Sequence, residues 1–290
     1  MSESSRAVKE IVTPEPVVEG AGVRLRRSIG TRQLDHLDPF LLLDHFDSVS
    51  PGDYEAGFPY HPHRGIETVT FVRKGEIRHG DSLGHRGTIG AGDIQWMTSG
   101  SGIMHEEMPQ VRPEGIGGLQ LWLNLPAKEK MTRPKYRDLQ GSALATTKLP
   151  DGALVRVIAG AADGGRITGP VDGLAVAPKF LDVTLPAGAA FREAVPRGHT
   201  AFAYVDQGEV RFGPEQRAAR APALVIFGNG DLVEAAAGEG GGRFLLAAAR
   251  PLHEPIARYG PFVMNTKSEI EQTLKELRDG SFIRAEPKDG

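Results

Sequence analysis

The fold and the site of this chain depend on one segment, Tyr60-His61-Pro62-His63-Arg64-Gly65-Ile66-Glu67. Successive side chains of an extended strand point to opposite faces, so His61 and His63 direct both imidazoles to one side while Pro62 faces away. A single histidine among the 9 in the chain is more often a hydrogen-bonded core or surface residue than a ligand. Because these two imidazoles share one strand face, the segment is nevertheless half of a candidate metal site.

The second half follows in Gly100-Ser101-Gly102-Ile103-Met104-His105-Glu106-Glu107. His105 and Glu107 repeat the spacing of two, so they share a strand face and Glu106 points the other way. If the two stretches form neighbouring strands, three imidazoles and one carboxylate converge on one point. Such a set of nitrogen and oxygen donors is a ligand shell for a divalent transition metal.

Strand alternation leaves the identity of the carboxylate open. Glu67 lies four residues after His63, so the same rule places it on the face of His63 and admits it beside Glu107. The glycines of the region fall at turn-like intervals, as a barrel of short antiparallel strands requires. These glycines are Gly65, Gly75, Gly90, Gly92, Gly100 and Gly102.

These residues resemble the cupin signature, a His-x-His followed by Glu and Gly and later by Gly-x-x-His. More narrowly, the chain resembles the pirin family over most of its length, from about residue 23 to about residue 283. The segments that carry the resemblance, in the family's order, are residues 37–44, 58–70, 102–109 and 259–265.

The resemblance implies an all-β bicupin: two antiparallel, jelly-roll-like barrels in tandem with a short C-terminal helix. It implies that His61, His63, His105 and Glu107 bind the metal. In pirins the carboxylate ligand matches Glu107, so Glu67 is expected outside the ligand shell. There it could accept a hydrogen bond or act as a base, and we treat Glu67 and Glu107 as the candidate catalytic residues.

The composition is that of a soluble globular protein, with 290 residues, 40% hydrophobic and 24% charged. The 37 Gly and 21 Pro favour a turn-rich all-β architecture. The formal net charge of -3 gives no general attraction to nucleic acid or anionic membrane. The best basic cluster, Arg24, Arg26 and Arg27, alternates as a solvated strand face does.

Cysteine is absent, which excludes disulfides, thiolate metal ligands and a Cys nucleophile. No N-terminal apolar run follows Met1, and no stretch approaches the roughly 20 apolar residues of a membrane span. We therefore expect a cytoplasmic protein with neither a nucleic-acid nor a membrane partner.

An internal repeat relates residues 70–80 to residues 203–213, where Val, Gly, Glu, Arg and Gly recur at matching places. It predicts two domains of one fold, residues 1–140 with the metal site and residues 141–290 without metal, because the second half contains no His-x-His. The lone His199 is expected to be structural. Residues 1–20 are expected to form a flexible arm or an edge segment.

The remaining expectations concern three other histidines and the C-terminal helix. His45 is either an ordinary loop histidine or a residue that supports the ligands, whereas His79 and His85 fall in apparent turns and are expected at the surface. Ser268 begins an expected capping box of the C-terminal helix. The apolar face of that helix holds Ile270, Leu274 and Leu277, and Gly280 ends it.

The site predicts one divalent ion, with Fe(II) preferred and Mn, Ni, Cu or Zn compatible. By resemblance, the activity is that of a quercetin 2,3-dioxygenase, an oxidoreductase that opens a flavonol ring with O2 and releases carbon monoxide. The flat substrate is expected to meet an aromatic-lined cavity near Phe58, Phe71, Trp96, Met97 and Met104. The alternatives are a metal-bound regulatory protein that acts on a protein partner, as eukaryotic pirins do, and an isomerase or metallohydrolase.

Overall fold

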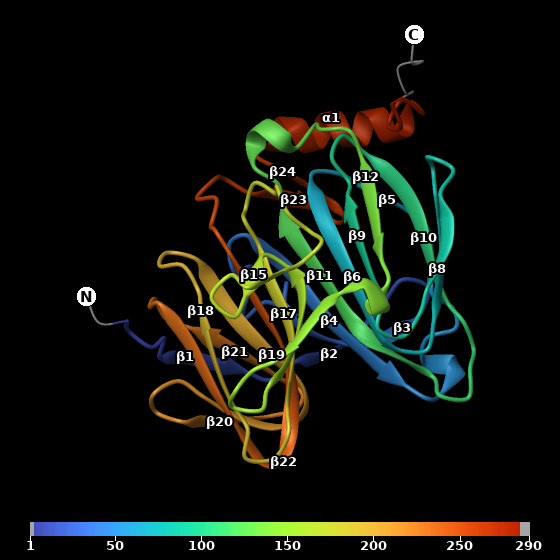
Figure 1. The fold of residues 1–290 in the computed structure, drawn as a ribbon. Helices are drawn as coiled ribbons and strands as arrows, with labels where there is room; N and C mark the ends of the chain where they lie inside the picture. The colour runs from blue at the N-terminus through green and yellow to red at the C-terminus, as the bar shows by residue number, and fades with distance from the viewer. Residues whose placement is uncertain (1–2, 285–290) are drawn as a thin grey trace. The chain divides into compact units, whose positions relative to one another are not determined.

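The computed structural model describes residues 3–284 and divides them into two compact units (Figure 1). The described residues up to Glu15 belong with Ala143–Leu252, whereas Pro16–Ser142 belong with the described residues from His253 onward. Each unit thus includes a terminal segment from the far end of the chain. The division of the sequence at residues 140 and 141 stays a prediction.

The unit that contains the His-x-His stretch is built from two antiparallel sheets. One has seven strands in the order β12-β9-β6-β11-β4-β3-β2, and the other has four in the order β5-β10-β7-β8. The strands are β2 (Glu15–Glu19), β3 (Val23–Ile29), β4 (Phe40–Ser48), β5 (Phe58–His63), β6 (Ile66–Lys74), β7 (Ile77–Asp81), β8 (Arg86–Ile89), β9 (Ile94–Thr98), β10 (Ile103–Pro109), β11 (Ile116–Asn124) and β12 (Lys135–Leu139). The hairpin of β23 (Ala257–Tyr259) and β24 (Phe262–Met264) and the helix α1 (Lys267–Arg278) complete the unit.

The two sheets of this unit face each other across a shared interior. Apolar side chains from both, including Phe46 and Val72 from one and Ile77 and Ile89 from the other, form a single buried cluster. Burial of such side chains stabilises by roughly 25 cal/mol per Å² of apolar surface. Side chains alternate along β11, where Leu119 is buried on one face while Gln120 lines a cavity on the other.

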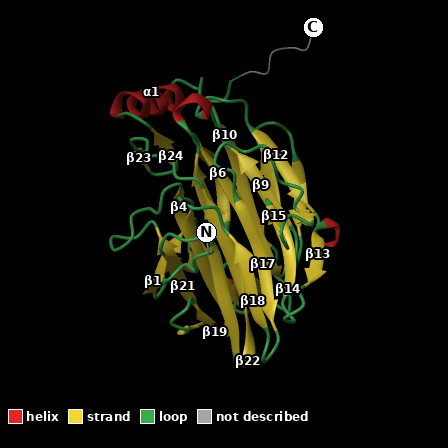
Figure 2. Ribbon diagram, turned by 60° about the vertical axis from the view of Figure 1, so that its left-hand side comes forward, coloured by secondary structure: helices red, strands yellow, loops and turns green. Residues whose placement is uncertain are grey.

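The other unit is a nine-stranded antiparallel assembly with its own apolar core (Figure 2). Its main path runs β1-β21-β19-β22-β17-β14-β13, with β18 paired to β22 and β20 paired to β19. The strands are β1 (Val8–Val12), β13 (Ala145–Lys148), β14 (Leu154–Ala159), β17 (Lys179–Leu185), β18 (Ala190–Ala194), β19 (Thr200–Phe212), β20 (Arg217–Arg220), β21 (Ala223–Phe227) and β22 (Leu232–Ala249), beside a small ribbon of β15 (Ala161–Ala162) and β16 (Ile167–Thr168). The predicted all-β fold with two barrels and one short C-terminal helix is confirmed.

The internal repeat corresponds to the same glycine bend in each of the two units. Gly75 between β6 and β7 has φ +75°, and an added Cβ would lie 2.2 Å from the Gly115 carbonyl oxygen. Gly208, its counterpart in β19, has φ +70° and would place a Cβ 2.3 Å from the Gly241 oxygen. Only glycine combines a left-handed backbone with so close an approach to another strand.

The N-terminal strands and the C-terminal helix bear on two of the expectations from sequence. Each of β1 and β2 is an edge strand of its sheet, which confirms an edge segment rather than a loose arm. The expected capping box at Ser268 is wrong: the N-cap is Thr266, whose side chain accepts from the Glu269 N–H while the Glu269 carboxylate accepts from the Thr266 N–H. Ser268 lies inside the first helical turn.

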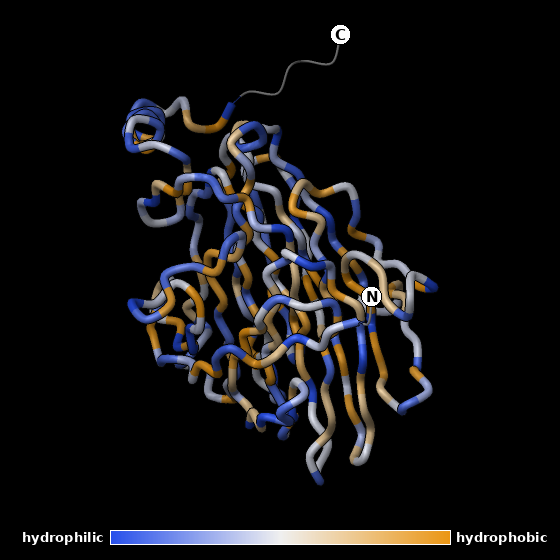
Figure 3. The backbone as a smooth tube through the Cα atoms, turned by 90° about the vertical axis from the view of Figure 1, so that its left-hand side faces the viewer, coloured by the Kyte–Doolittle hydropathy of each residue, from blue (hydrophilic) through white to orange (hydrophobic). Residues whose placement is uncertain are grey.

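Helix α1 packs through its apolar face, with Ile270 buried and Leu274 and Leu277 beside it. Most residues of this helix are hydrophilic (Figure 3). Among the described residues, no helix has both the length and the apolar character needed to cross a membrane.

Replacing Gly75 with alanine should destabilise the protein by roughly 2–4 kcal/mol, because the left-handed backbone and the Gly115 carbonyl both oppose a Cβ. Urea unfolding measures the effect. Gly52→Ala is the matched control, since Gly52 has no left-handed backbone and nothing lies within 4 Å of its added Cβ. Equal losses in the two variants would contradict this account of the bend.

Candidate metal centre

Strands β5 and β10 are antiparallel neighbours, as the two ligand pairs require. His61 lies directly opposite His105, and His63 lies opposite Ile103. An irregularity between His105 and Glu107 shifts the register, so Glu107 faces Phe58 across the ladder. The pairing therefore brings His105 next to His61 and His63, which lie about forty residues earlier in the sequence.

The three imidazoles converge. The Nε2 atoms of His61 and His63 are 3.1 Å apart, and the ring centre of His105 is 4.5 Å from that of His61 and 5.1 Å from that of His63. One nitrogen from each ring lies within 4.8 Å of the other two. Within residues 3–284, the buried Nε2 of His105 has no hydrogen-bond partner, which is the condition expected of a nitrogen that awaits a ligand.

Two of the rings have a hydrogen-bond partner on the side away from the cluster. The Nδ1–H of His61 donates to the Pro59 carbonyl at 2.8 Å, so its Nε2 carries the lone pair. The Nδ1 of His105 pairs with the Tyr136 hydroxyl at 3.2 Å. Hydrogen bonds of this kind fix the orientation and tautomer of metal-binding histidines.

Electrostatics keep the buried rings neutral. Burial lowers the pKa of His63 well below its usual range, and the nearby His61 adds to this. Burial, followed by His63, His61 and His79, lowers the pKa of His105 in the same way. Because a metal ligand must be an unprotonated imidazole, the centre is prepared to bind a cation. The donor set fits a divalent transition metal.

Among the described residues, the group of convergent ligand atoms contains the three histidines but not the predicted ligand Glu107, whose side chain reaches the opposite sheet. The Glu107 carboxylate accepts a hydrogen bond from Thr70 of β6 at 2.9 Å, and the side chain lines the same cavity as His61 and His63. Burial raises the pKa of Glu107, while His61 and the Thr70 hydroxyl oppose the shift. Glu106 does not line the cavity, as the alternation of β10 predicts.

The expected common face of His63 and Glu67 is wrong. Between these residues the chain turns at Arg64 and Gly65, leaving β5 and entering β6, so the alternation does not continue. Along β6, Glu67 and Thr70 are three apart and face opposite sides, and Thr70 is the one that lines the cavity. Glu67 instead accepts a hydrogen bond from Thr98 at 2.8 Å. Burial raises its pKa.

Two other histidines differ from the simplest expectation. His79 is buried rather than at the surface, and its ring stacks on Tyr136 at 5.9 Å. His45 lies within β4 rather than in a loop, and it alternates with the cavity-lining Asp44 and Phe46, so it faces away from the site. Burial lowers the pKa of His45 to about 4.

Sequence reasoning missed Tyr136. The segment that contains it is rich in Lys and Arg and reads as a connection between domains, yet β12 pairs with β9 through Tyr136 opposite Met97. The alternation of Lys135 to Leu139 is the signal that could have identified the strand.

The corner between β5 and β6 is held by residues far along the chain. Arg64 is 1% exposed and donates to the Ser101 carbonyl, to Thr273 and to Glu276 of α1. Lys130, also 1% exposed, donates to the Gly65 carbonyl at 2.9 Å. These bonds fix the backbone directly after His63.

Lys130 also joins this corner to β24. Its ammonium donates to the Val263 carbonyl at 2.8 Å and to the side-chain oxygen of Asn124. Burial lowers the pKa of Lys130 to about 7, against the opposing effects of Glu254 and Glu269.

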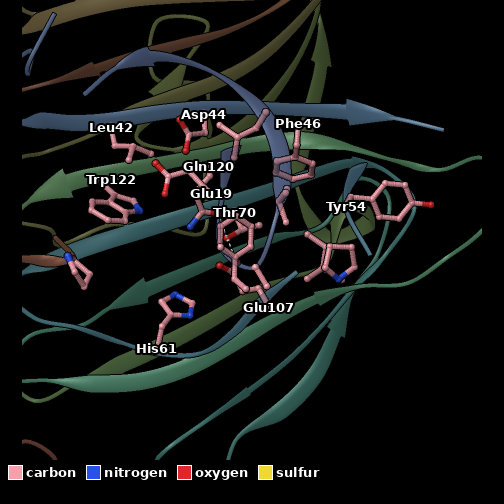
Figure 4. Close-up of a pocket in the computed structure, with 18 of the residues that line it drawn as sticks. Glu19, Leu42, Asp44, Phe46, Tyr54, His61, Thr70, Glu107, Gln120 and Trp122 are labelled. Carbon is pink, nitrogen blue, oxygen red and sulfur yellow. Dashed lines mark hydrogen bonds between the residues drawn. The ribbon is translucent and has the colours of Figure 1, made fainter. Parts of the chain in front are cut away.

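His61 and His63 line a cavity of about 640 Å³ between the two sheets. Figure 4 shows Gln120 and Trp122 on one side of it and His61 and Glu107 on another. Of the five apolar residues expected around a substrate, only Phe58 lines the cavity. The aromatic lining comes mostly from other positions, namely Phe46, Tyr54 and Trp122.

The fold and site define a two-barrel protein with a histidine-based metal centre in one barrel. The Pirin family model matches residues 22–123, and the model described as "Pirin C-terminal cupin domain" matches residues 180–283. A Pseudomonas aeruginosa protein named "Putative quercetin 2,3-dioxygenase PA3240" is 44% identical over 279 residues, which cover 95% of this chain and 97% of that protein. Human pirin is 41% identical over 290 residues, covering 97% and 96%.

Among solved structures, the crystal structure of quercetin 2,3-dioxygenase from Acinetobacter baumannii superimposes with a TM-score of 0.86 at 33% identity, covering 96% of this chain and 99% of that one. The chain therefore belongs to the pirin family of bicupin proteins.

We expect His105→Ala and Glu107→Ala each to lower the affinity for a divalent metal at least roughly tenfold. The reason is that both side chains lie on the same face of β10, which pairs with the strand that carries His61 and His63. Titration calorimetry with Zn(II) measures the change. Glu106→Ala, on the other face, is the control; a comparable loss in that variant would show that the face assignment is wrong.

The buried ammonium of Lys130 should make stability depend on pH. In the folded state its pKa is about 7, whereas in the unfolded chain it is about 10.4. Between these values the unfolded state binds more protons, so stability rises with pH, at most by about 1.4 kcal/mol per pH unit. The difference in unfolding free energy between wild type and Lys130→Met should therefore increase from pH 7 to pH 10. A constant difference would mean that the three acceptors keep Lys130 charged in the fold.

Proposed function

We propose that this protein is a metal-dependent dioxygenase of the quercetin 2,3-dioxygenase type, which opens the heterocycle of a flavonol-like substrate with O2. The observation that carries the proposal is the cluster of three imidazoles, two of which, those of His61 and His63, line a cavity of about 640 Å³ with largely apolar walls. The name of the Pseudomonas relative and that of the Acinetobacter structure support the choice of reaction.

On this proposal His61, His63 and His105 hold one divalent ion, with Glu107 as the fourth ligand or as the base next to it. Fe(II) is the preferred ion, and Mn, Ni, Cu or Zn suit the same donors. When bound, the ion would supply Lewis acidity and a place at which O2 and substrate oxygens meet. The remaining steps depend on residues of this chain.

The cavity walls orient a flat substrate. Phe58 and Trp122 offer ring faces and edges to an aromatic system, and Trp122 meets the His63 ring edge-on at 5.1 Å. Aromatic contacts of this kind favour offset or perpendicular packing and contribute roughly 0.5–1.5 kcal/mol each. The substrate would be held with its vicinal hydroxyl and carbonyl groups toward the imidazoles.

Glu107 is the residue of this chain best placed to take the hydroxyl proton. Its carboxylate lies in the cavity wall, it is buried, and its raised pKa makes it a better base than an exposed glutamate. Thr70 donates to the carboxylate and holds it in place. Loss of the proton makes the flavonol ring electron-rich and therefore reactive toward O2. Glu67 faces away from the cavity and has no part in this step.

With the Fe(II)-loaded protein under anaerobic preparation, addition of quercetin and air should consume O2 and release carbon monoxide. Glu107→Gln should lower the turnover number at least roughly a hundredfold if Glu107 is the base, whereas Glu106→Gln should have little effect. Metal analysis of each variant separates loss of the base from loss of the ion.

Absence of both O2 consumption and carbon monoxide from fully metal-loaded protein would contradict the dioxygenase. The metal-bound regulatory protein would then be the better description, because the metal centre and cavity need no turnover to bind a small molecule or to respond to one.

A further inference from the structure

The cavity contains two arginines in different electrostatic situations, Arg27 and Arg258. Arg27 is fully paired: its Nε and Nη2 donate to the two oxygens of Asp44 at 2.7 and 2.8 Å, and its Nη1 donates to Glu19 at 2.7 Å. Both carboxylates at this end of the cavity are therefore already engaged. Little of the charge of Arg27 is available to a ligand.

Arg258 lies at the mouth of the same cavity and has weaker partners. Its Nη1 donates to the Leu41 carbonyl and its Nε to the Gly260 carbonyl, each at 3.3 Å. Across residues 3–284, no carboxylate lies within ion-pair distance of this guanidinium, although Asp35, Asp44 and Glu19 are near enough to influence it through space. Arg258 is therefore an exposed cation with unused donors facing a cavity.

Trp122 connects Arg258 to the metal centre. The guanidinium lies 5.2 Å from the centre of the Trp122 ring, and the same ring meets His63 edge-on at 5.1 Å. A guanidinium stacked on an aromatic ring is held in orientation while its outer N–H groups stay free. A planar ligand in the cavity would thus have the imidazoles at one end and Arg258 at the other.

We propose that Arg258 is an anion-recognising residue, and that the physiological substrate is a planar aromatic compound with a carboxylate remote from its metal-binding oxygens. This inference rests on the proposed function only in taking the cavity as the substrate site, and it narrows the substrate class. A guanidinium matches a carboxylate with two parallel, charge-assisted N–H···O bonds, and a neutral flavonol has no ionised acceptor with which to form them. Quercetin would then be a substrate that leaves this contact unused.

The test compares the binding of 2-naphthoate with that of 2-naphthamide, two planar probes that differ in charge, to metal-loaded protein by titration calorimetry. Wild type should prefer the carboxylate by roughly fivefold to tenfold, given the exposure of Arg258. In Arg258→Gln and in Arg258→Met, which keeps an apolar stem over Trp122, the two probes should bind almost equally, with the affinity for 2-naphthamide unchanged. Arg24→Gln is the control, because Arg24 is exposed and does not line the cavity.

A preference for 2-naphthoate that persists in both neutral variants would overturn the proposal, because another group, such as the metal, would then hold the carboxylate. Equal binding of the two probes to wild type would overturn it as well. The measurement uses no turnover, so its result is independent of whether the protein cleaves quercetin.

Discussion

The backbone corner at Arg64 and Gly65 is the constraint on which the site depends. Gly65 has φ +78°, and a Cβ there would lie 2.0 Å from the Val263 carbonyl oxygen. The corner takes the chain from one sheet to the other in two residues, so His63 ends a strand of one wall and Ile66 begins a strand of the facing wall. Without this turn, the imidazoles and the cavity wall opposite them could not come from one continuous segment.

The same corner explains which sequence inferences held and which did not. Side-chain alternation is reliable inside an unbroken strand, so the opposite placement of Glu106 and Glu107 in β10 and the cavity-facing Gln120 in β11 could be predicted. It fails across a change of sheet, and for that reason Glu67 lies on the far face of β6. The all-β class and the repeated glycine bend were also predictable, because turn chemistry is local.

The parts that could not be predicted come from distant segments. Lys130, Tyr136 and Arg258 reach the site through pairing and packing; the alternation around Tyr136 indicates a strand, but nothing in the neighbouring residues indicates which partner each side chain meets. The terminal segment from His253 onward belongs to the same unit as the metal centre, and its Glu276 pairs with Arg64 at 2.7 Å next to His63. A buried ion pair of this kind is costly to break by removing one partner. The C-terminal helix is therefore a structural support of the metal-binding strand, which no local periodicity could have indicated.

Charge balance links the centre to its cavity. On the proposed ligand set of three neutral imidazoles and one carboxylate, a bound divalent cation would keep one positive charge uncompensated among side chains that are mostly buried. An uncompensated charge in such surroundings is unfavourable, and an ionised substrate oxygen would remove it. On the proposed function, deprotonating the substrate would therefore balance the charge of the site in the same step that makes the ring reactive. An additional carboxylate on that substrate could not be neutralised by the same ion, and Arg258, which has no carboxylate within ion-pair distance among residues 3–284, remains available for it.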